Sequence, residues 1–196
     1  MKKIILDLCG GTGSWSKPYL EAGYDVRNIT LPEYDVLTYK PPEDVYGILA
    51  APPCTMFSFA RTRAKTPRDF RSAMEVVKAC LNVIWECRIN NKLKFWALEN
   101  PMDYLRQFLG KPYFTFDPWQ FGDLYTKKTD LWGYFTKPRI KYKNINDIIP
   151  SVTEQNKLKQ NIRKLPSISE ITSSTQADRR AVTPQGFANA FFKANK

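Results

Sequence analysis

The sequence contains no histidine among its 196 residues, and it has only four cysteines. Without an imidazole, histidine-dependent hydrolases, zincins and histidine-ligated deaminases are excluded. The cysteines at positions 9, 54, 80 and 87 form no CxxC pair, so the pattern predicts neither a disulfide framework nor a zinc or other metal site. Any catalysis must therefore use cysteine, carboxylates, lysine, arginine or hydroxyl groups.

Long apolar runs are also missing. None approaches the roughly 20 residues that cross a bilayer, and Met1-Lys2-Lys3 leads into a short strand-like run instead of a cleavage site. We therefore expect a protein of a reducing, cytoplasmic compartment with no membrane partner. The length suits one compact domain with its own apolar core.

Acidic residues are too few to balance the basic ones: 30 lysines and arginines stand against 19 acidic residues, for a formal net charge of +11. Most of the excess comes from residues 61–71 and 136–165. Such clusters are either a solvated surface or a binding surface for a polyanion, and the interleaved Phe70 and Tyr142 favour nucleic acid. The candidate contacts in these clusters are Arg61, Arg63, Lys141 and Lys143.

Strand-like and helix-like segments alternate along the first hundred residues. A stripe of helical period predicts a long helix over residues 73–89. The alternation predicts an α/β fold with a mostly parallel sheet, and aromatic segments at 113–116 and 131–135 predict antiparallel pairing at its edge. Apolar runs predict the strands, at residues 3–8, 24–30, 45–51 and 94–98.

The chain divides into three parts. Residues 1–136 form the predicted catalytic core, residues 137–177 a small basic segment, and residues 178–196 a return to the core. Ser16 is expected to cap a short first helix that ends at Gly23. Thr183 is expected to cap the closing helix over 184–194, with Pro184 at its first position.

A glycine-rich loop follows the first predicted strand, where the backbone can approach a ligand closely. It lacks both the GxGxxG fingerprint of dinucleotide binding and the Gly-Lys-Ser/Thr ending of a P-loop. A nucleoside-type cofactor without pyrophosphate, such as S-adenosylmethionine, is the better fit, and a tight turn with no ligand is the alternative. The candidate cofactor residues of the loop are Asp7, Leu8, Cys9, Gly10, Gly11, Thr12 and Gly13.

Two further segments carry candidate chemistry at strand ends. Cys54 stands on a loop stiffened by Pro52 and Pro53, where nearby arginines could favour its thiolate. Glu99 ends an apolar run, where burial would raise the pKa of its carboxyl group and let it share a proton with a ring nitrogen. The alternatives are a buried structural cysteine and a carboxylate that only bonds its own loop.

Together, the glycine-rich loop, Pro52-Pro53-Cys54 and Glu99-Asn100-Pro101 resemble the DNA cytosine-5 methyltransferase family in kind and order. The resemblance covers residues 3 to about 135 and resumes in the final helix. It implies a Rossmann-like S-adenosylmethionine-dependent methyltransferase fold. It also implies that Cys54 adds to C6 of a cytosine, that Glu99 protonates or hydrogen-bonds N3, and that Asn100 holds the loop or the geometry of Glu99.

The resemblance extends to weaker candidates. Asp35 is similar to the acidic residue with which the family contacts the cofactor adenine, and Glu33 is a candidate for the ribose. Where the family carries Gln-x-Arg-x-Arg, this chain has Tyr125-Thr126-Lys127-Lys128-Thr129. Lys128 is therefore a candidate catalytic residue and Lys127 a candidate nucleic-acid contact, although lysine lacks the bidentate fork of arginine.

The predicted target-recognition segment, residues 137–177, is shorter than the lobe that the family devotes to this task. Either a short site is read, or self-association or an accessory subunit completes the reading, or the substrate is not duplex DNA. We expect methylation of cytosine in DNA. The alternatives are the same chemistry on RNA or a free pyrimidine nucleotide, and a catalytically silent protein that binds nucleic acid.

Overall fold

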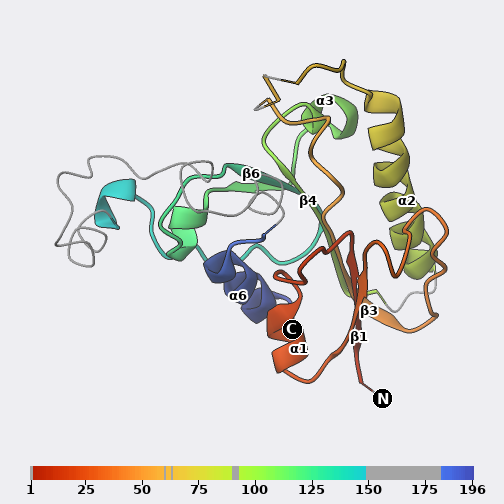
Figure 1. The fold of residues 1–196 in the computed structure, drawn as a ribbon. Helices are drawn as coiled ribbons and strands as arrows, with labels where there is room; N and C mark the ends of the chain where they lie inside the picture. Colours follow the sequence, from red (N-terminus) through yellow and green to blue (C-terminus); the bar gives the residue numbers. More distant parts are fainter. Residues whose placement is uncertain (1, 60, 63, 90–92, 149–181) are drawn as a thin grey trace.

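The protein is described by a computed structural model over residues 2–59, 61–62, 64–89, 93–148 and 182–196. Arg63 and residues 149–177 of the predicted basic segment lie outside the described residues. Six strands form one mixed sheet in the order β2-β1-β3-β4-β6-β5 (Figure 1). The strands are β1 (Ile4–Leu8), β2 (Asp25–Ile29), β3 (Val45–Ala50), β4 (Phe95–Pro101), β5 (Phe114–Phe116) and β6 (Thr129–Tyr134).

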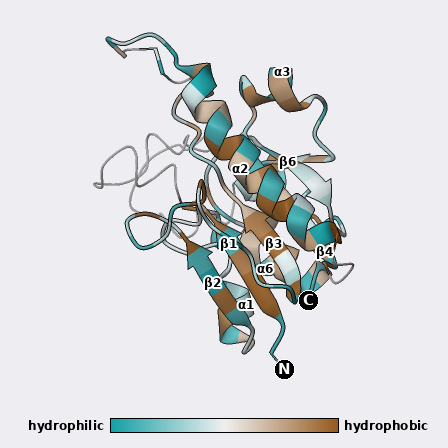
Figure 2. Cartoon of the chain, turned by 90° about the vertical axis from the view of Figure 1, so that its right-hand side faces the viewer, coloured by the Kyte–Doolittle hydropathy of each residue, from teal (hydrophilic) through white to brown (hydrophobic). Residues whose placement is uncertain are grey.

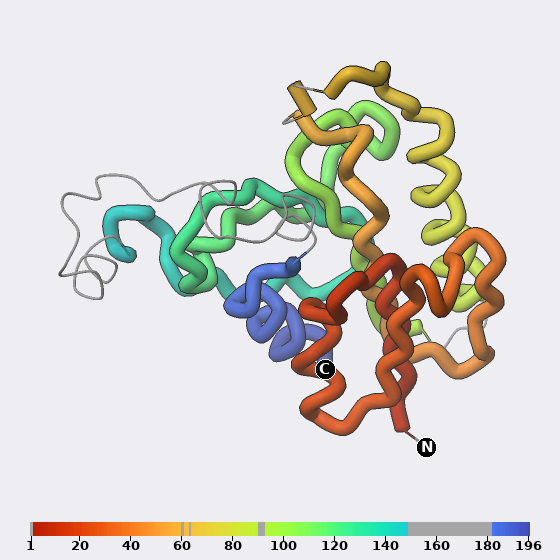
Figure 3. Tube along the Cα trace, in the orientation of Figure 1, coloured from red at the N-terminus to blue at the C-terminus, as the bar shows by residue number. Residues whose placement is uncertain are grey.

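Helices cover both faces of this sheet. The long helix α2 lies on one face, and α1 and α6 lie together on the other (Figures 1 and 2). Figure 3 shows how this brings the last turns of the chain beside its first helix. The helices are α1 (Lys17–Glu21), α2 (Phe70–Ile89), α3 (Leu105–Leu109) and α6 (Gln185–Ala194), with short 3₁₀ turns η1 (Pro118–Phe121) and η2 (Ile145–Asp147).

The apolar core is divided by the sheet into two clusters, as the alternation of side chains along a strand requires. In β1, Leu6 packs in the cluster under α2, whereas Ile5 packs in the cluster under α1 and α6. In β3, Ile48 and Leu49 divide in the same way. Because both faces are buried, the central strands read as continuous apolar runs, which Figure 2 shows as brown ribbons.

The predicted α/β fold, mostly parallel with an antiparallel edge, is confirmed. β1, β2, β3 and β4 pair in parallel, and β6 runs antiparallel to both β4 and β5. One boundary was predicted too early, because the strand over 94–98 continues through Glu99 and Asn100 to Pro101. The added residues pair with β6, opposite Leu131 and Asp130.

One predicted helix cap is right in position only, and the other is wrong. Ser16 is the N-cap residue of α1, but its side chain makes no capping hydrogen bond and instead donates from Oγ to Oδ2 of Asp7 at 2.5 Å. The closing helix begins at Gln185 instead of Pro184, because Pro184 is extended, with a φ of −56° and a ψ of 132°, and serves as the N-cap residue. Thr183 therefore lies one residue before the cap. No helix in the described part of the chain is long and apolar enough to cross a membrane.

Candidate active site

The strand order reverses at β1. From β1 the chain first runs to β2 on one side and then to β3 on the other side. In open α/β sheets, ligands bind at such a reversal, beyond the carboxyl ends of the strands. The glycine-rich loop leaves β1 at this edge, and the Cys54 loop leaves β3 beside it, with the end of β4 next in the sheet (Figure 1).

The glycine-rich loop is fixed by its backbone. A β-carbon on Gly10 would lie 2.4 Å from Cγ of Asp7 and 2.6 Å from Oδ1 of Asn28, so only glycine fits there. Gly11 has a φ of +52°, and a β-carbon there would meet no atom within 4 Å. Cys9 adopts a φ of 56°, a left-handed conformation that is uncommon outside glycine. The loop is therefore closed against the protein at Gly10 and open at Gly11.

Asp7 supports this loop from beneath. Its side chain is fully buried, and burial raises the pKa of the carboxyl group from 3.8 to about 6, despite the hydrogen bond from Ser16. The other oxygen, Oδ1, has no hydrogen-bond partner among the described residues, and neither has Oδ1 of the neighbouring Asn28. The amide of Asn28 donates to the carbonyl oxygen of Gly11 at 2.9 Å, which ties β2 to the loop.

The remaining predicted cofactor residues differ in exposure. Leu8 belongs to the core, whereas Thr12 lies at the surface. Glu33 and Asp35 are exposed on the segment after β2, and Oδ1 of Asp35 accepts a hydrogen bond from the backbone of Leu37 at 2.9 Å. Cys9 is half-buried, with Sγ 3.9 Å from Sγ of Cys80, and this contact lowers the pKa of Cys9 against the effects of burial and of the nearby charges of Asp7 and Asp35.

The Cys54 loop begins directly after β3 and turns back on itself. The backbone amides of Phe57 and Ser58 donate to the carbonyl oxygen of Cys54 at 3.0 and 2.8 Å. Nδ2 of Asn100 donates to the carbonyl oxygen of Pro52 at 2.9 Å in a buried hydrogen bond. Cys54 itself is half-buried. The two predicted motifs are thus joined side by side, on adjacent strands of the sheet.

Glu99 lies at this junction beside a buried lysine. Nζ of Lys127 is 3.7 Å from Oε1 of Glu99, and the two side chains are 7% and 12% exposed. Burial raises the pKa of Glu99, and the charge of Lys127 opposes this shift only in part. Lys128, the predicted catalytic lysine, is exposed; burial raises the pKa of Asp117, and the charge of Lys128 opposes this shift only in part. Of the two lysines, it is Lys127 that contacts Glu99.

The sequence did not reveal a second ion pair behind this site. Arg106 of α3 makes a bidentate contact with Asp130, which is fully buried, and Thr115 of β5 donates to the same carboxylate at 2.6 Å. Asp130 lies opposite Asn100 in the register of β4 and β6. The pair therefore fixes the strand that flanks the motif. Its members are 24 residues apart, so no local pattern pointed to it.

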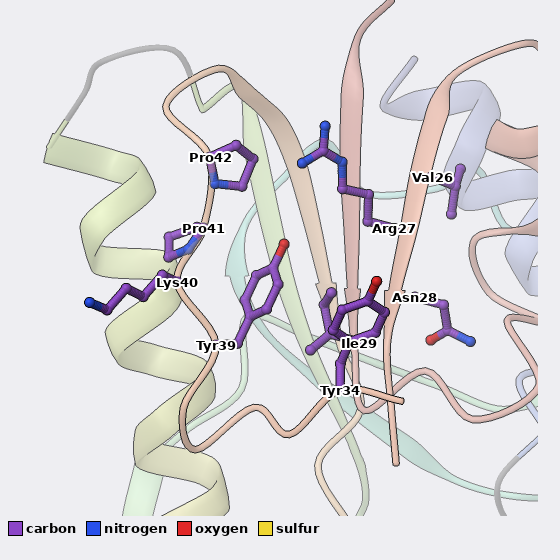
Figure 4. A pocket seen from close by; sticks show the side chains of 9 residues that line it. All are labelled: Val26, Arg27, Asn28, Ile29, Tyr34, Tyr39, Lys40, Pro41 and Pro42. Carbon is purple, nitrogen blue, oxygen red and sulfur yellow. The ribbon is translucent and has the colours of Figure 1, made fainter. Parts of the chain in front are cut away.

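A cavity of about 640 Å³ opens along β2, the edge strand (Figure 4). Its lining includes Tyr34 and Tyr39, whose rings lie on the same side of β2 as Arg27. Tyr34 stands between the predicted cofactor residues Glu33 and Asp35, and Asn28 connects the cavity wall to Gly11. The Asn28 side chain points away from the two rings, so no residue of the glycine-rich loop lines the cavity, and of the acidic segment only Tyr34 does (Figure 4).

The predicted nucleic-acid contacts lie apart from the buried ion pair, except for Lys127. Arg61 is bonded to Thr66, with Nη1 2.7 Å from its carbonyl oxygen and Nη2 2.6 Å from its hydroxyl group. Lys141 and Lys143 are exposed after β6, and Nζ of Lys141 lies 4.8 Å from the ring centre of Tyr142.

Comparison with known proteins found no match, either among protein-family models or among curated proteins. The function must therefore be argued from the site.

Proposed function

We propose that the protein is an S-adenosylmethionine-dependent methyltransferase that methylates C5 of cytosine in DNA through a covalent Cys54 adduct. One observation carries the proposal: the hydrogen bond from Asn100 to Pro52 joins the loop of Cys54 to the strand end of Glu99. A cysteine and a carboxyl group of raised pKa then stand on adjoining segments, and addition to a pyrimidine ring requires both groups. A Rossmann-like methyltransferase fold is consistent with the strand order and its reversal at β1.

The residues at and beside the end of β1 fit the cofactor in two respects. The backbone at Gly10 leaves no space for a side chain, while the loop is open at Gly11. The buried Oδ1 atoms of Asp7 and Asn28 are acceptors without a partner among the described residues, which suits a ligand rich in donors. When bound, S-adenosylmethionine supplies an electrophilic methyl group.

Cys54 and Glu99 divide the work on the pyrimidine ring. The Cys54 thiolate forms a bond to C6, and the displaced electron pair makes C5 nucleophilic. Glu99 in its protonated form donates to N3 and stabilises the charge that develops on the ring. After C5 has gained a methyl group, loss of the C5 proton to a base restores the C5–C6 double bond and breaks the bond to sulfur. Each of these steps proceeds without an imidazole.

Lys127 sets the balance between the two forms of Glu99. Burial favours the neutral carboxyl group, and the positive charge 3.7 Å away favours the carboxylate. Because the raised pKa keeps the proton on Glu99 to a higher pH than in water, the acid form is present below this pKa and is lost as the pH rises through it. Activity that depends on the acid form should therefore fall on the alkaline side.

The proposal is tested by incubating the protein with methyl-labelled S-adenosylmethionine and, in parallel, DNA, RNA or deoxycytidine monophosphate. Label in DNA, recovered as 5-methylcytosine, is the expected result. Label only in RNA or in the nucleotide would keep the chemistry and change the substrate. Absence of label from every acceptor would contradict the proposed enzyme. If nucleic acid still bound, the protein would be a catalytically silent binding protein.

A further inference from the structure

Two aromatic rings meet at the surface where the Cys54 loop touches the segment after β4. Phe59, five positions after Cys54, is 53% exposed. Its ring centre lies 4.6 Å from that of half-buried Tyr104, five positions after Glu99, with the planes at 89°. The backbone amide of Tyr104 donates to the carbonyl oxygen of Phe57 at 3.2 Å. The pair is thus built by the same two segments that carry the proposed catalytic groups.

Further rings, from fully buried Phe57 to Phe108 at 45% exposure, pack behind this pair. Phe57 is fully buried, and its ring stacks on Phe70 with centres 6.0 Å apart. Phe70 in turn lies 5.7 Å from Tyr104 and 5.4 Å from Phe108. Because the Phe59 ring is already held by its neighbours, it loses little conformational freedom when a ligand covers it. The entropic cost of binding at this ring is therefore small.

Positive charge accompanies the rings. The guanidinium group of Arg68 lies 4.9 Å from the ring centre of Tyr104, and its Nη1 donates to the carbonyl oxygen of Met56 at 2.7 Å. Exposed Lys65 and Arg71 flank Arg68 in sequence, and Asp69 is the one acidic residue between 61 and 71. Exposed aromatic faces beside a basic segment are typical of proteins that bind single-stranded nucleic acid.

We propose that Phe59, Tyr104 and Arg68 form a platform for unpaired nucleotides next to the target cytosine, and that the acceptor is single-stranded DNA. The inference rests on the proposed function. A base needs a free face to stack on a ring, and only an unpaired strand offers such faces, because a duplex keeps its bases stacked on one another. The platform belongs to the same loop as Cys54, so a base held on it would neighbour the target base that must leave its stack to react.

The test measures binding of fluorescent oligonucleotides by anisotropy, without cofactor, for the wild type and for Phe59→Ala and Phe59→Trp. We expect Phe59→Ala to weaken single-stranded DNA binding by about 10-fold, the cost of losing one stacked base. Phe59→Trp, which keeps an aromatic ring, should bind as tightly as the wild type. Trp85→Ala is the matched control, because Trp85 is 63% exposed near the other end of α2. It should leave the affinity unchanged.

Three outcomes would overturn the platform: equal affinity of wild type and Phe59→Ala for single-stranded DNA, tighter binding of duplex DNA or RNA than of single-stranded DNA, or no binding of any oligonucleotide. The last result would leave the rings as a surface for a protein partner. Because the assay contains no cofactor, its result is separate from methyl transfer. Phe59-dependent binding without transfer would refute the proposed enzyme and retain the platform.

Discussion

The loops after β1 and β3 leave the same edge of the sheet, but different forces hold them. The first is constrained chiefly by its own backbone, with no space at Gly10 and left-handed conformations at Cys9 and Gly11, and the amide of Asn28 adds one hydrogen bond to Gly11. The second is held by side chains from elsewhere, chiefly the amide of Asn100 on the carbonyl oxygen of Pro52. A loop of the first kind has a rigid backbone of its own, whereas a loop of the second kind depends on a residue far away in the sequence.

The contrast predicts that Gly10→Ala damages both stability and cofactor binding. Its β-carbon would stand 2.4 Å from Cγ and 2.5 Å from Oδ1 of Asp7, which are buried and cannot move aside. We expect a loss of about 3 kcal/mol in the free energy of unfolding and loss of S-adenosylmethionine binding in equilibrium dialysis. Gly23→Ala is the control. It meets no atom within 4 Å at a φ of +84°, and should cost only about 1 kcal/mol. Equal losses in the two variants would show that the first loop is not fixed in this way.

Lys127→Met tests the ion pair between Lys127 and Glu99 beside the second loop. At pH 8 the Glu99 carboxylate would be left buried without this charge, and we expect a loss of about 3 kcal/mol in urea unfolding. At pH 5 the loss should be smaller, because the raised pKa of Glu99 favours its neutral form. Lys128→Met, at the exposed neighbour, should change stability by less than about 0.5 kcal/mol. A Lys127→Met loss that is independent of pH would contradict the pairing.

Asp7→Asn isolates the buried carboxyl group of the first loop. A pKa raised from 3.8 to about 6 stabilises the folded protein below about pH 4, and this contribution is lost as the pH rises to about 6. The wild type should therefore lose up to about 3 kcal/mol relative to Asp7→Asn over this range. The free energy of unfolding of both proteins is measured at each pH from 4 to 7. A constant difference would mean that Asp7 titrates normally.

Apart from the control variants, Asn100→Ala should have the smallest effect on stability. It removes the donor to Pro52, at a cost of about 1–2 kcal/mol for an unsatisfied buried carbonyl group. The informative measurement is hydrogen exchange at the amides of Phe57 and Ser58, which close the turn around Cys54. We expect faster exchange there and unchanged exchange in the glycine-rich loop. Unchanged exchange in both loops would show that the second loop does not depend on the hydrogen bond from Asn100.

The same contrast explains what could be predicted from the sequence. The glycine-rich turn, the long helix and the central strands depend on local patterns, and their positions were predicted to within a few residues. The continuation of β4 through Glu99 and Asn100 depends on pairing with β6, and the Arg106–Asp130 pair joins residues far apart in the chain. The hydrogen bond from Ser16 to Asp7 was not predicted, because it forms only when the loop folds back over β1.

The central claim is tested most directly by trapping the Cys54 adduct. Single-stranded DNA containing 5-fluorocytosine is incubated with the protein and S-adenosylmethionine, since fluorine at C5 prevents the elimination that releases the enzyme. We expect a stable covalent complex whose modified peptide contains Cys54. Cys87→Ala, at a buried cysteine of α2, should still form the complex, and Cys54→Ala should not. A complex that forms with Cys54→Ala, or one attached to another residue, would contradict the account.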